Sequence, residues 1–89
     1  MSDLKILLVD DELLNLKLYE KMLKEHNYLI SLAINGQECL DRVSEDIPDL
    51  VILDWNMPVM SGIEALEILK SSDLTKDIPV LMITGVMTS

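Results

Sequence analysis

The chain has 89 residues, a length that allows one small domain and excludes a two-domain enzyme. Hydrophobic residues make up 49% of it and charged residues 26%, which excludes a disordered chain, and the single cysteine excludes an intramolecular disulfide. Sixteen acidic residues against seven basic ones give a net charge of −9, which argues against binding to a nucleic-acid backbone and favours cationic partners or metal ions.

Strand and helix signals alternate along the chain. Continuous apolar runs at residues 6–9, 50–53 and 80–83 are typical of strands covered on both faces, and residues 28–34, interrupted by Ser31, predict a more peripheral strand. Between these strands we predict helices at residues 12–26, at about 37–45, and after Ser61. The order indicates βαβ units, and therefore a parallel sheet in an α/β domain.

Local patterns add detail to the helices. The first helix is predicted to turn its apolar residues Leu18, Tyr19, Met22 and Leu23 inward. Asn35 with Glu38 resembles a capping box, as does Ser61 with Glu64. Cys39 lies on the apolar face of the second helix, where we expect a small core residue rather than a ligand.

Polar residues end three of the apolar runs. Asp10 and Asp11 follow the first run, Asp54 the second and Thr84 the third. Ligands of open parallel sheets bind beyond the carboxyl ends of the strands. If the first and third strands are neighbours, three carboxylates converge, and such a cluster needs a cation to offset the repulsion. Oxygen ligands favour Mg²⁺, and a carboxylate beside such an ion can act as a nucleophile and become an aspartyl phosphate.

Three segments resemble the receiver domains of two-component response regulators. They are Leu-Val-Asp-Asp-Glu at 8–12, Leu-Asp-Trp-Asn-Met-Pro-Val-Met-Ser-Gly at 53–62, and Pro-Val-Leu-Met-Ile-Thr-Gly at 79–85. Residues 54–58 are especially similar to the single-domain chemotaxis regulator. The resemblance implies a flavodoxin-like parallel sheet with strand order 2-1-3-4. It also implies that residues 1–89 form one receiver that stops after the fourth strand, without the final helix-strand-helix of the family.

The resemblance also implies a role for each strand-end residue. Asp54 would accept a phosphoryl group from a histidine kinase or a phosphotransfer protein, in a signalling domain rather than an enzyme. Mg²⁺ would be held by the side chains of Asp11 and Asp54, by the backbone carbonyl of Asn56, and by Asp10 mostly through water. Thr84 would be the hydroxyl that turns toward the phosphoryl group and transmits the phosphorylation state.

The chain departs from the family pattern at its carboxyl end. No lysine follows Lys76, so the lysine that the family carries on its fifth strand has no counterpart, and we expect weak or slow phosphorylation. The fourth strand would be an edge carrying an apolar run, so we expect self-association through that strand or through uncovered apolar faces.

Two other functions remain open at this point. The chain could be an inactive, self-associating receiver fragment, or a small phosphohydrolase with an Asp nucleophile. The second is disfavoured because phosphohydrolases of the haloacid dehalogenase type place another Asp two residues after the nucleophile, where this chain has Asn56. The N-terminus lacks a signal-peptide layout and no apolar run has transmembrane length, so we expect a cytoplasmic protein without membrane contact.

Overall fold

Strands and helices alternate along the chain as predicted. The computed structural model describes residues 4–54 and 60–83. Its elements are β1 (Lys5–Val9), α1 (Leu13–Lys24), β2 (Leu29–Ala33), α2 (Gly36–Glu45), β3 (Leu50–Asp54), α3 (Gly62–Lys70) and β4 (Val80–Ile83). Two predicted site residues, Asn56 and Thr84, lie outside the described residues.

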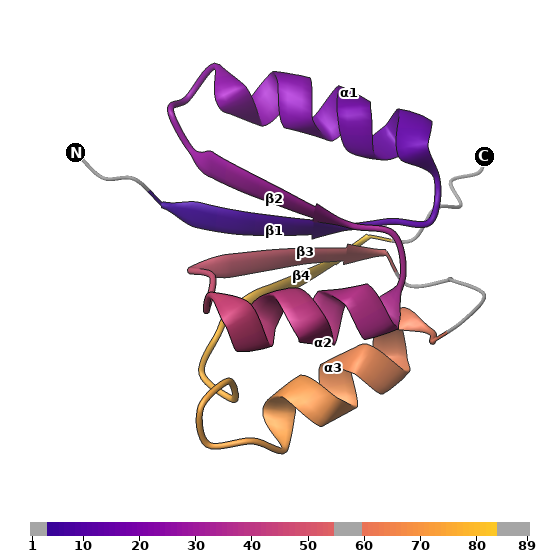
Figure 1. Ribbon diagram of the computed structural model, residues 1–89, viewed down its shortest axis with the longest axis vertical. Coiled ribbons are helices and arrows are strands. Elements are labelled where there is room, and N and C mark those ends of the chain that lie inside the picture. The colour runs from indigo at the N-terminus through magenta and orange to yellow at the C-terminus, as the bar shows by residue number, and fades with distance from the viewer. Residues whose placement is uncertain (1–3, 55–59, 84–89) are drawn as a thin grey trace.

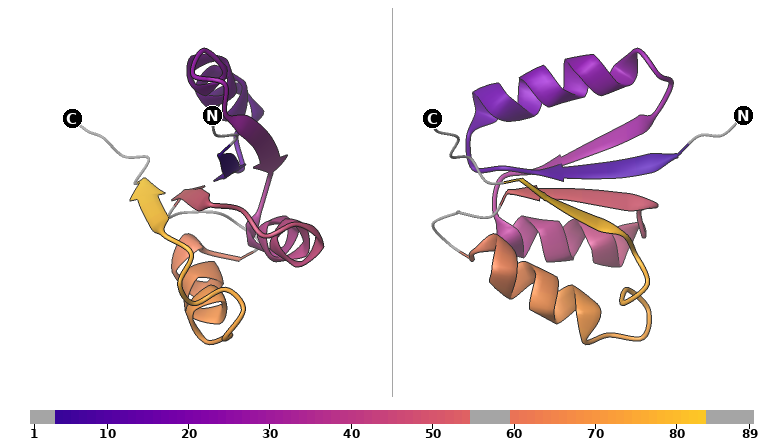
Figure 2. Two further views of the ribbon diagram at one scale, coloured as in Figure 1. Left: turned by 90° about the vertical axis from the view of Figure 1, so that its left-hand side faces the viewer. Right: turned by 180° about the vertical axis from the view of Figure 1, so that it is seen from behind.

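The four strands form one parallel sheet in the order β2-β1-β3-β4, which confirms the predicted topology (Figure 1). In register, Leu7 of β1 pairs with Ser31 of β2 and with Val51 of β3, and Val51 pairs with Val80 of β4. Helix α1 covers one face of the sheet, and α2 and α3 cover the other (Figure 2). None of the three described helices has the length and apolar content to span a bilayer.

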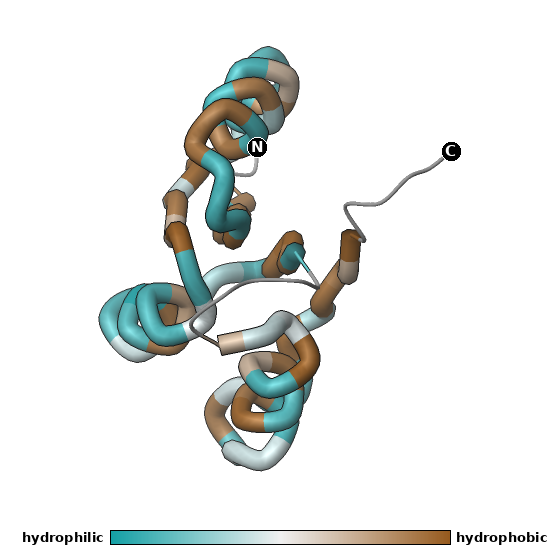
Figure 3. Tube along the Cα trace, turned by 90° about the vertical axis from the view of Figure 1, so that its right-hand side faces the viewer, coloured by the Kyte–Doolittle hydropathy of each residue, from teal (hydrophilic) through white to brown (hydrophobic). Residues whose placement is uncertain are grey.

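The apolar runs become strands because both faces of the sheet are covered. Along β1, Ile6 and Leu8 face α1, whereas Leu7 and Val9 face α2 and α3, as the two-residue period of a strand requires. Among the described residues, the core under α2 and α3 is the larger, with ten buried residues against three under α1. Figure 3 shows the hydrophobic residues along the strands in the middle of the molecule.

The inward face of α1 differs from the prediction. Leu16 is fully buried, Tyr19 and Leu23 are half-buried, but Leu18 and Met22 are each 56% exposed. Residues 16, 19 and 23 follow the i, i+3, i+7 spacing of one helix face, and the predicted set was rotated from it by about one residue. Leucines lie all around this helix, so its hydrophobic period does not determine its rotation.

Side-chain capping interactions occur at the amino-terminal ends of α2 and α3. At α3 the capping box is complete, because Glu64 N donates to Ser61 Oγ at 3.2 Å and Ser61 N donates to Glu64 Oε1 at 3.0 Å. At α2 only half of the box forms: Asn35 Oδ1 accepts from Glu38 N at 2.8 Å, whereas Glu38 Oε1 accepts from the N–H of Ile34.

Gly36 opens α2 against the segment that leads into α3. A Cβ atom at residue 36 would lie 2.7 Å from Met60 Cβ and 2.9 Å from Met60 Sδ, closer than van der Waals contact allows. A glycine at this position therefore lets the amino end of α2 approach Met60.

Cys39 is fully buried in the larger core, as expected, and burial raises the pKa of its thiol from 9.0 to about 11. We expect the native protein to resist iodoacetamide at pH 8, whereas the urea-unfolded chain should react readily. The raised pKa means that the folded chain holds this proton more tightly than the unfolded chain does. The resulting stability is therefore present below pH 9 and is lost between pH 9 and about 11. A Cys39→Ala variant should lack that loss of stability at alkaline pH. Rapid alkylation of the native protein by iodoacetamide would contradict burial of the thiol.

Candidate metal and phosphoacceptor site

Three carboxylates meet where β1 and β3 end. Asp10 and Asp11 follow β1, Asp54 is the last residue of β3, and the two strands pair side by side through Val9 and Leu53. One carboxylate oxygen from each aspartate lies within 4.8 Å of the other two. The strand order changes direction between β1 and β3, so the cluster lies at the topological switch point, where ligands of such sheets bind.

The three aspartates differ in exposure. Asp10 is 7% exposed and Asp54 is 8% exposed, whereas Asp11 lies on the surface. Asp10 is held on both oxygens: Oδ1 accepts from Glu12 N at 2.9 Å, and Oδ2 accepts from Asn15 Nδ2 at 3.3 Å. Its backbone N–H donates to Ala33 O at 3.1 Å, which ties the end of β1 to the end of β2.

The donor set suits a hard divalent cation. All three groups are carboxylates, which Mg²⁺ prefers and soft metals do not. Oxygens bound to one octahedral Mg²⁺ lie about 2.9 to 4.2 Å apart. A cluster whose oxygens lie within 4.8 Å of one another therefore fits such an ion if the oxygens move slightly closer together, or if a water lies between the ion and one carboxylate.

Part of this geometry follows from the sequence. The strand-end positions of Asp10, Asp11 and Asp54 predict that the three converge, and the structure brings them together. The contact of Asn15, which reaches Asp10 from the first turn of α1, is not predicted by the sequence. The sequence signal for that contact was weak, because a five-residue separation across a strand-to-helix turn belongs to no helical or strand spacing.

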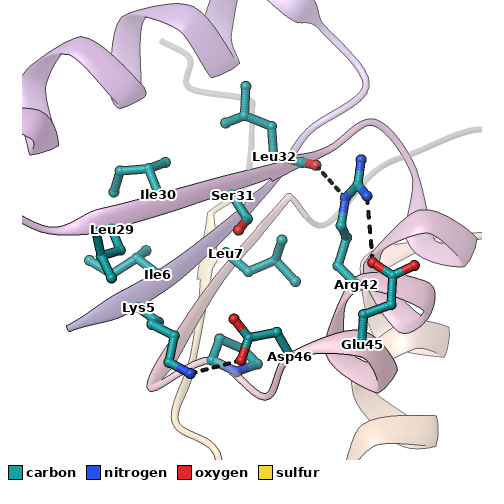
Figure 4. Close-up of a pocket in the computed structure, with 11 residues that line it drawn as sticks. Lys5, Ile6, Leu7, Leu29, Ile30, Ser31, Leu32, Arg42, Glu45 and Asp46 are labelled. Carbon is teal, nitrogen blue, oxygen red and sulfur yellow. Dashed lines mark hydrogen bonds and ion pairs between the residues drawn. The ribbon is translucent and has the colours of Figure 1, made fainter. Parts of the chain in front are cut away.

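Figure 4 shows a cavity that is lined by none of the three aspartates. It has a volume of about 410 Å³ and lies between β1, β2 and the carboxyl end of α2. Its charged groups are already paired: Lys5 Nζ lies 2.7 Å from Asp46 Oδ1, and Arg42 Nε donates to Leu32 O at 3.2 Å. The hydrogen bond to Asp46 raises the pKa of Lys5. This cavity therefore does not compete with the aspartate cluster as a charged site.

Residues 6–89 match the response regulator receiver domain family. The chain belongs to that family. The receiver is 35% identical over 80 residues to the polar-differentiation response regulator DivK of Brucella anthropi, covering 90% of the receiver and 65% of DivK. It spans 25% of another, longer curated relative.

Solved structures agree with this assignment. The N-terminal domain of a response regulator receiver protein from Methanoculleus marisnigri has a TM-score of 0.91 and 40% identity, over 99% of the receiver and 72% of that chain. Chemotaxis protein CheY4 of Vibrio cholerae has a TM-score of 0.90 and 30% identity, over 98% of the receiver and 72% of that chain. Receivers are signalling domains, and the predicted likeness to chemotaxis regulators is confirmed.

Proposed function

We propose that this receiver is the phosphoacceptor of a two-component phosphorelay, and that Asp54 takes the phosphoryl group from a histidine kinase or a phosphotransfer protein. The observation that carries the proposal is the meeting of Asp54 with Asp10 and Asp11 at the switch point of a receiver fold. Incubation with acetyl phosphate and Mg²⁺ tests it. The intact mass should gain one phosphoryl group, and no gain from either this donor or a kinase would reject it.

The step is a transfer between two residues. One carboxylate oxygen of Asp54 attacks phosphorus, an O–P bond forms, and the P–N bond of the donor phosphohistidine breaks with its electron pair left on the imidazole nitrogen. Asp54 is the last residue of a central strand, so the sheet holds its backbone. Its side chain lies at the carboxyl end of that strand and is 8% exposed. Asp10 and Asp11 lie beside it, so the receiver itself supplies mainly positioning.

We propose Mg²⁺ as the cofactor. The side chains of Asp11 and Asp54 would hold it, with the backbone carbonyl of Asn56 and, through water, Asp10. When bound, the ion would offset the negative charge of the three carboxylates and of the incoming phosphoryl group. Thr84 stays the proposed switch hydroxyl, and weak or slow phosphorylation stays a prediction.

Calorimetric titration should detect Mg²⁺ binding to the folded receiver, because the ion relieves repulsion among clustered carboxylates. Asp11→Asn should weaken that binding at least about tenfold, because it removes one of the charged ligands proposed for the ion. Asp41→Asn, which removes the same charge from the exposed surface of α2, should leave it unchanged. Equal binding by the two variants would move the ion away from the aspartate cluster.

We propose that the 89-residue chain self-associates through β4. Leu81 is 54% exposed on this edge strand, beside an apolar groove lined by Tyr19, Met22, Leu23, Ile52 and Ile83. Association should increase with salt, which screens repulsion between chains of charge −9. Sedimentation velocity at rising concentration measures it. Leu81→Lys should favour the monomer and Leu74→Lys, at a 77% exposed residue in the segment before β4, should not. A wild-type monomer throughout would reject the proposal.

Two further expectations concern partners and location. The acidic balance disfavours nucleic acid and anionic lipid surfaces as partners of this domain, and we propose a cytoplasmic location.

A further inference from the structure

One side chain of α1 connects two acidic residues at the edge of the aspartate cluster. Asn15 is half-buried in the first turn of the helix, and its Nδ2 lies 3.3 Å from Asp10 Oδ2 and 3.1 Å from Glu12 Oε1. The amide nitrogen carries two hydrogens, so it can donate to both carboxylates together.

Asp10 depends on this contact more than Glu12 does. Glu12 is exposed, whereas Asp10 is 7% exposed and has few ways to satisfy its charge with solvent. Its Oδ1 is held by the backbone N–H of Glu12, and its Oδ2 is held by Asn15. Because the two donors engage different oxygens, together they restrict rotation of the carboxylate.

We propose that Asn15 is a positioning residue that holds the carboxylate of Asp10 in the orientation used for the divalent cation. The inference rests on the proposed function, since it deepens the account of the same site. Asn15 acts through Asp10 and needs no contact with the ion itself.

The residue type supports the proposal. Asn is a poorer helix former than Leu, and α1 otherwise uses leucine at residues 13, 14, 16 and 18. A neutral amide donates hydrogen bonds without adding a positive charge that would compete with a cation, and without adding a further negative charge. Departure from local helix preference beside a functional cluster is a pattern seen at functional sites.

The contact is tested first in the metal-free chain. Asn15→Leu improves helix propensity while it removes the donor, so its effect alone is ambiguous. A double-mutant cycle with Asp10→Ala cancels the propensity change. Asn15→Leu shifts the urea midpoint in each background. With Asp10 present, that shift should be less favourable to the folded state than with Ala at residue 10, and the two shifts should differ by about 0.3 to 0.7 M. Additive midpoints would overturn the inference, whatever the metal does.

The role toward the cation is tested by calorimetric Mg²⁺ titration. Asn15→Leu should weaken binding about three- to tenfold, at or below the usual effect of groups that orient metal ligands. Asn15→Gln keeps the amide and should recover most of the loss. Gln37→Leu is the matched control, because it removes an amide that donates to Asp41 Oδ1 at 3.2 Å on the surface of α2, and it should bind as wild type does.

The outcomes separate the two proposals. If wild type binds Mg²⁺ and Asn15→Leu binds it within twofold of wild type, the positioning role is overturned. An equal loss of Mg²⁺ affinity in Asn15→Leu and Asn15→Gln would also overturn it. A wild-type chain that binds no Mg²⁺ would overturn the proposed cofactor and the cation part of this inference. A coupled metal-free cycle would then still support the Asn15–Asp10 contact.

Discussion

Asp54→Asn should reduce phosphoryl transfer to the receiver below detection, whether the donor is acetyl phosphate or a kinase. The substitution keeps the size and shape of the side chain at the end of β3 but replaces the nucleophilic carboxylate oxygens with an amide, which is far less nucleophilic. Intact-mass spectrometry after incubation with donor and Mg²⁺ measures the effect, and acid-labile, base-labile phosphate on the wild-type chain would identify an acyl phosphate.

The control comes from the other end of the same strand. Asp49 directly precedes β3, lies on the surface and accepts a hydrogen bond from the backbone N–H of Lys5 at 2.8 Å, which an asparagine oxygen can also accept. Asp49→Asn therefore removes one negative charge without touching the cluster, and it should be phosphorylated as wild type is. Undiminished phosphorylation of Asp54→Asn would place the acceptor on another residue and remove the basis of the proposed function.

Leu16→Ala should be the most destabilising alanine substitution in α1, with a loss of about 2 to 5 kcal/mol in the free energy of unfolding. Leu16 is the one fully buried residue of this helix and packs with Ile6 and Leu8 of β1 against the sheet. Small domains have free energies of unfolding of about 5 to 15 kcal/mol, so this one truncation removes a large part of the total. Urea unfolding followed by circular dichroism measures it.

A leucine two residues earlier provides the control. Leu14 is 82% exposed, and Leu14→Ala should change the free energy of unfolding by no more than about 0.5 kcal/mol. Both substitutions replace leucine with alanine inside the same helix, so they change helix propensity alike, and the difference between them isolates burial. Similar losses in the two variants would show that α1 is not held to the sheet through Leu16.

Periodicity predicts which segments are strands or helices better than it predicts how a helix faces its sheet. In β1 every residue of the apolar run is buried, so the pattern and the burial agree without any choice of face. In α1 leucines occur at residues 13, 14, 16 and 18, and several rotations of the helix would bury an apolar stripe. Contact with Ile6 and Leu8 selects the rotation that buries Leu16, so Leu18 and Met22 remain exposed.

The candidate site likewise has one part that the sequence predicts and another that it does not. The position of Asp54 at a strand end and of Asp10 and Asp11 after an apolar run could be read from the residues in order, since a buried parallel strand commonly gives way to polar residues at the open edge. Asn15 could not be recognised as their neighbour, because its reach to Asp10 depends on how the turn at Asp11 and Glu12 docks α1 over β1.

The sequence by itself therefore determined the order of the elements, their parallel arrangement and the acidic chemistry of the strand ends, because these depend on local hydrophobic period and residue type. The residue pattern left open whether β1 and β3 are neighbours, and the family resemblance implied that they are. The tertiary structure places them side by side and brings three carboxylates within 4.8 Å of one another. It also decided that Asn15 holds one of them, since side-chain contacts depend on the docking of one element against another.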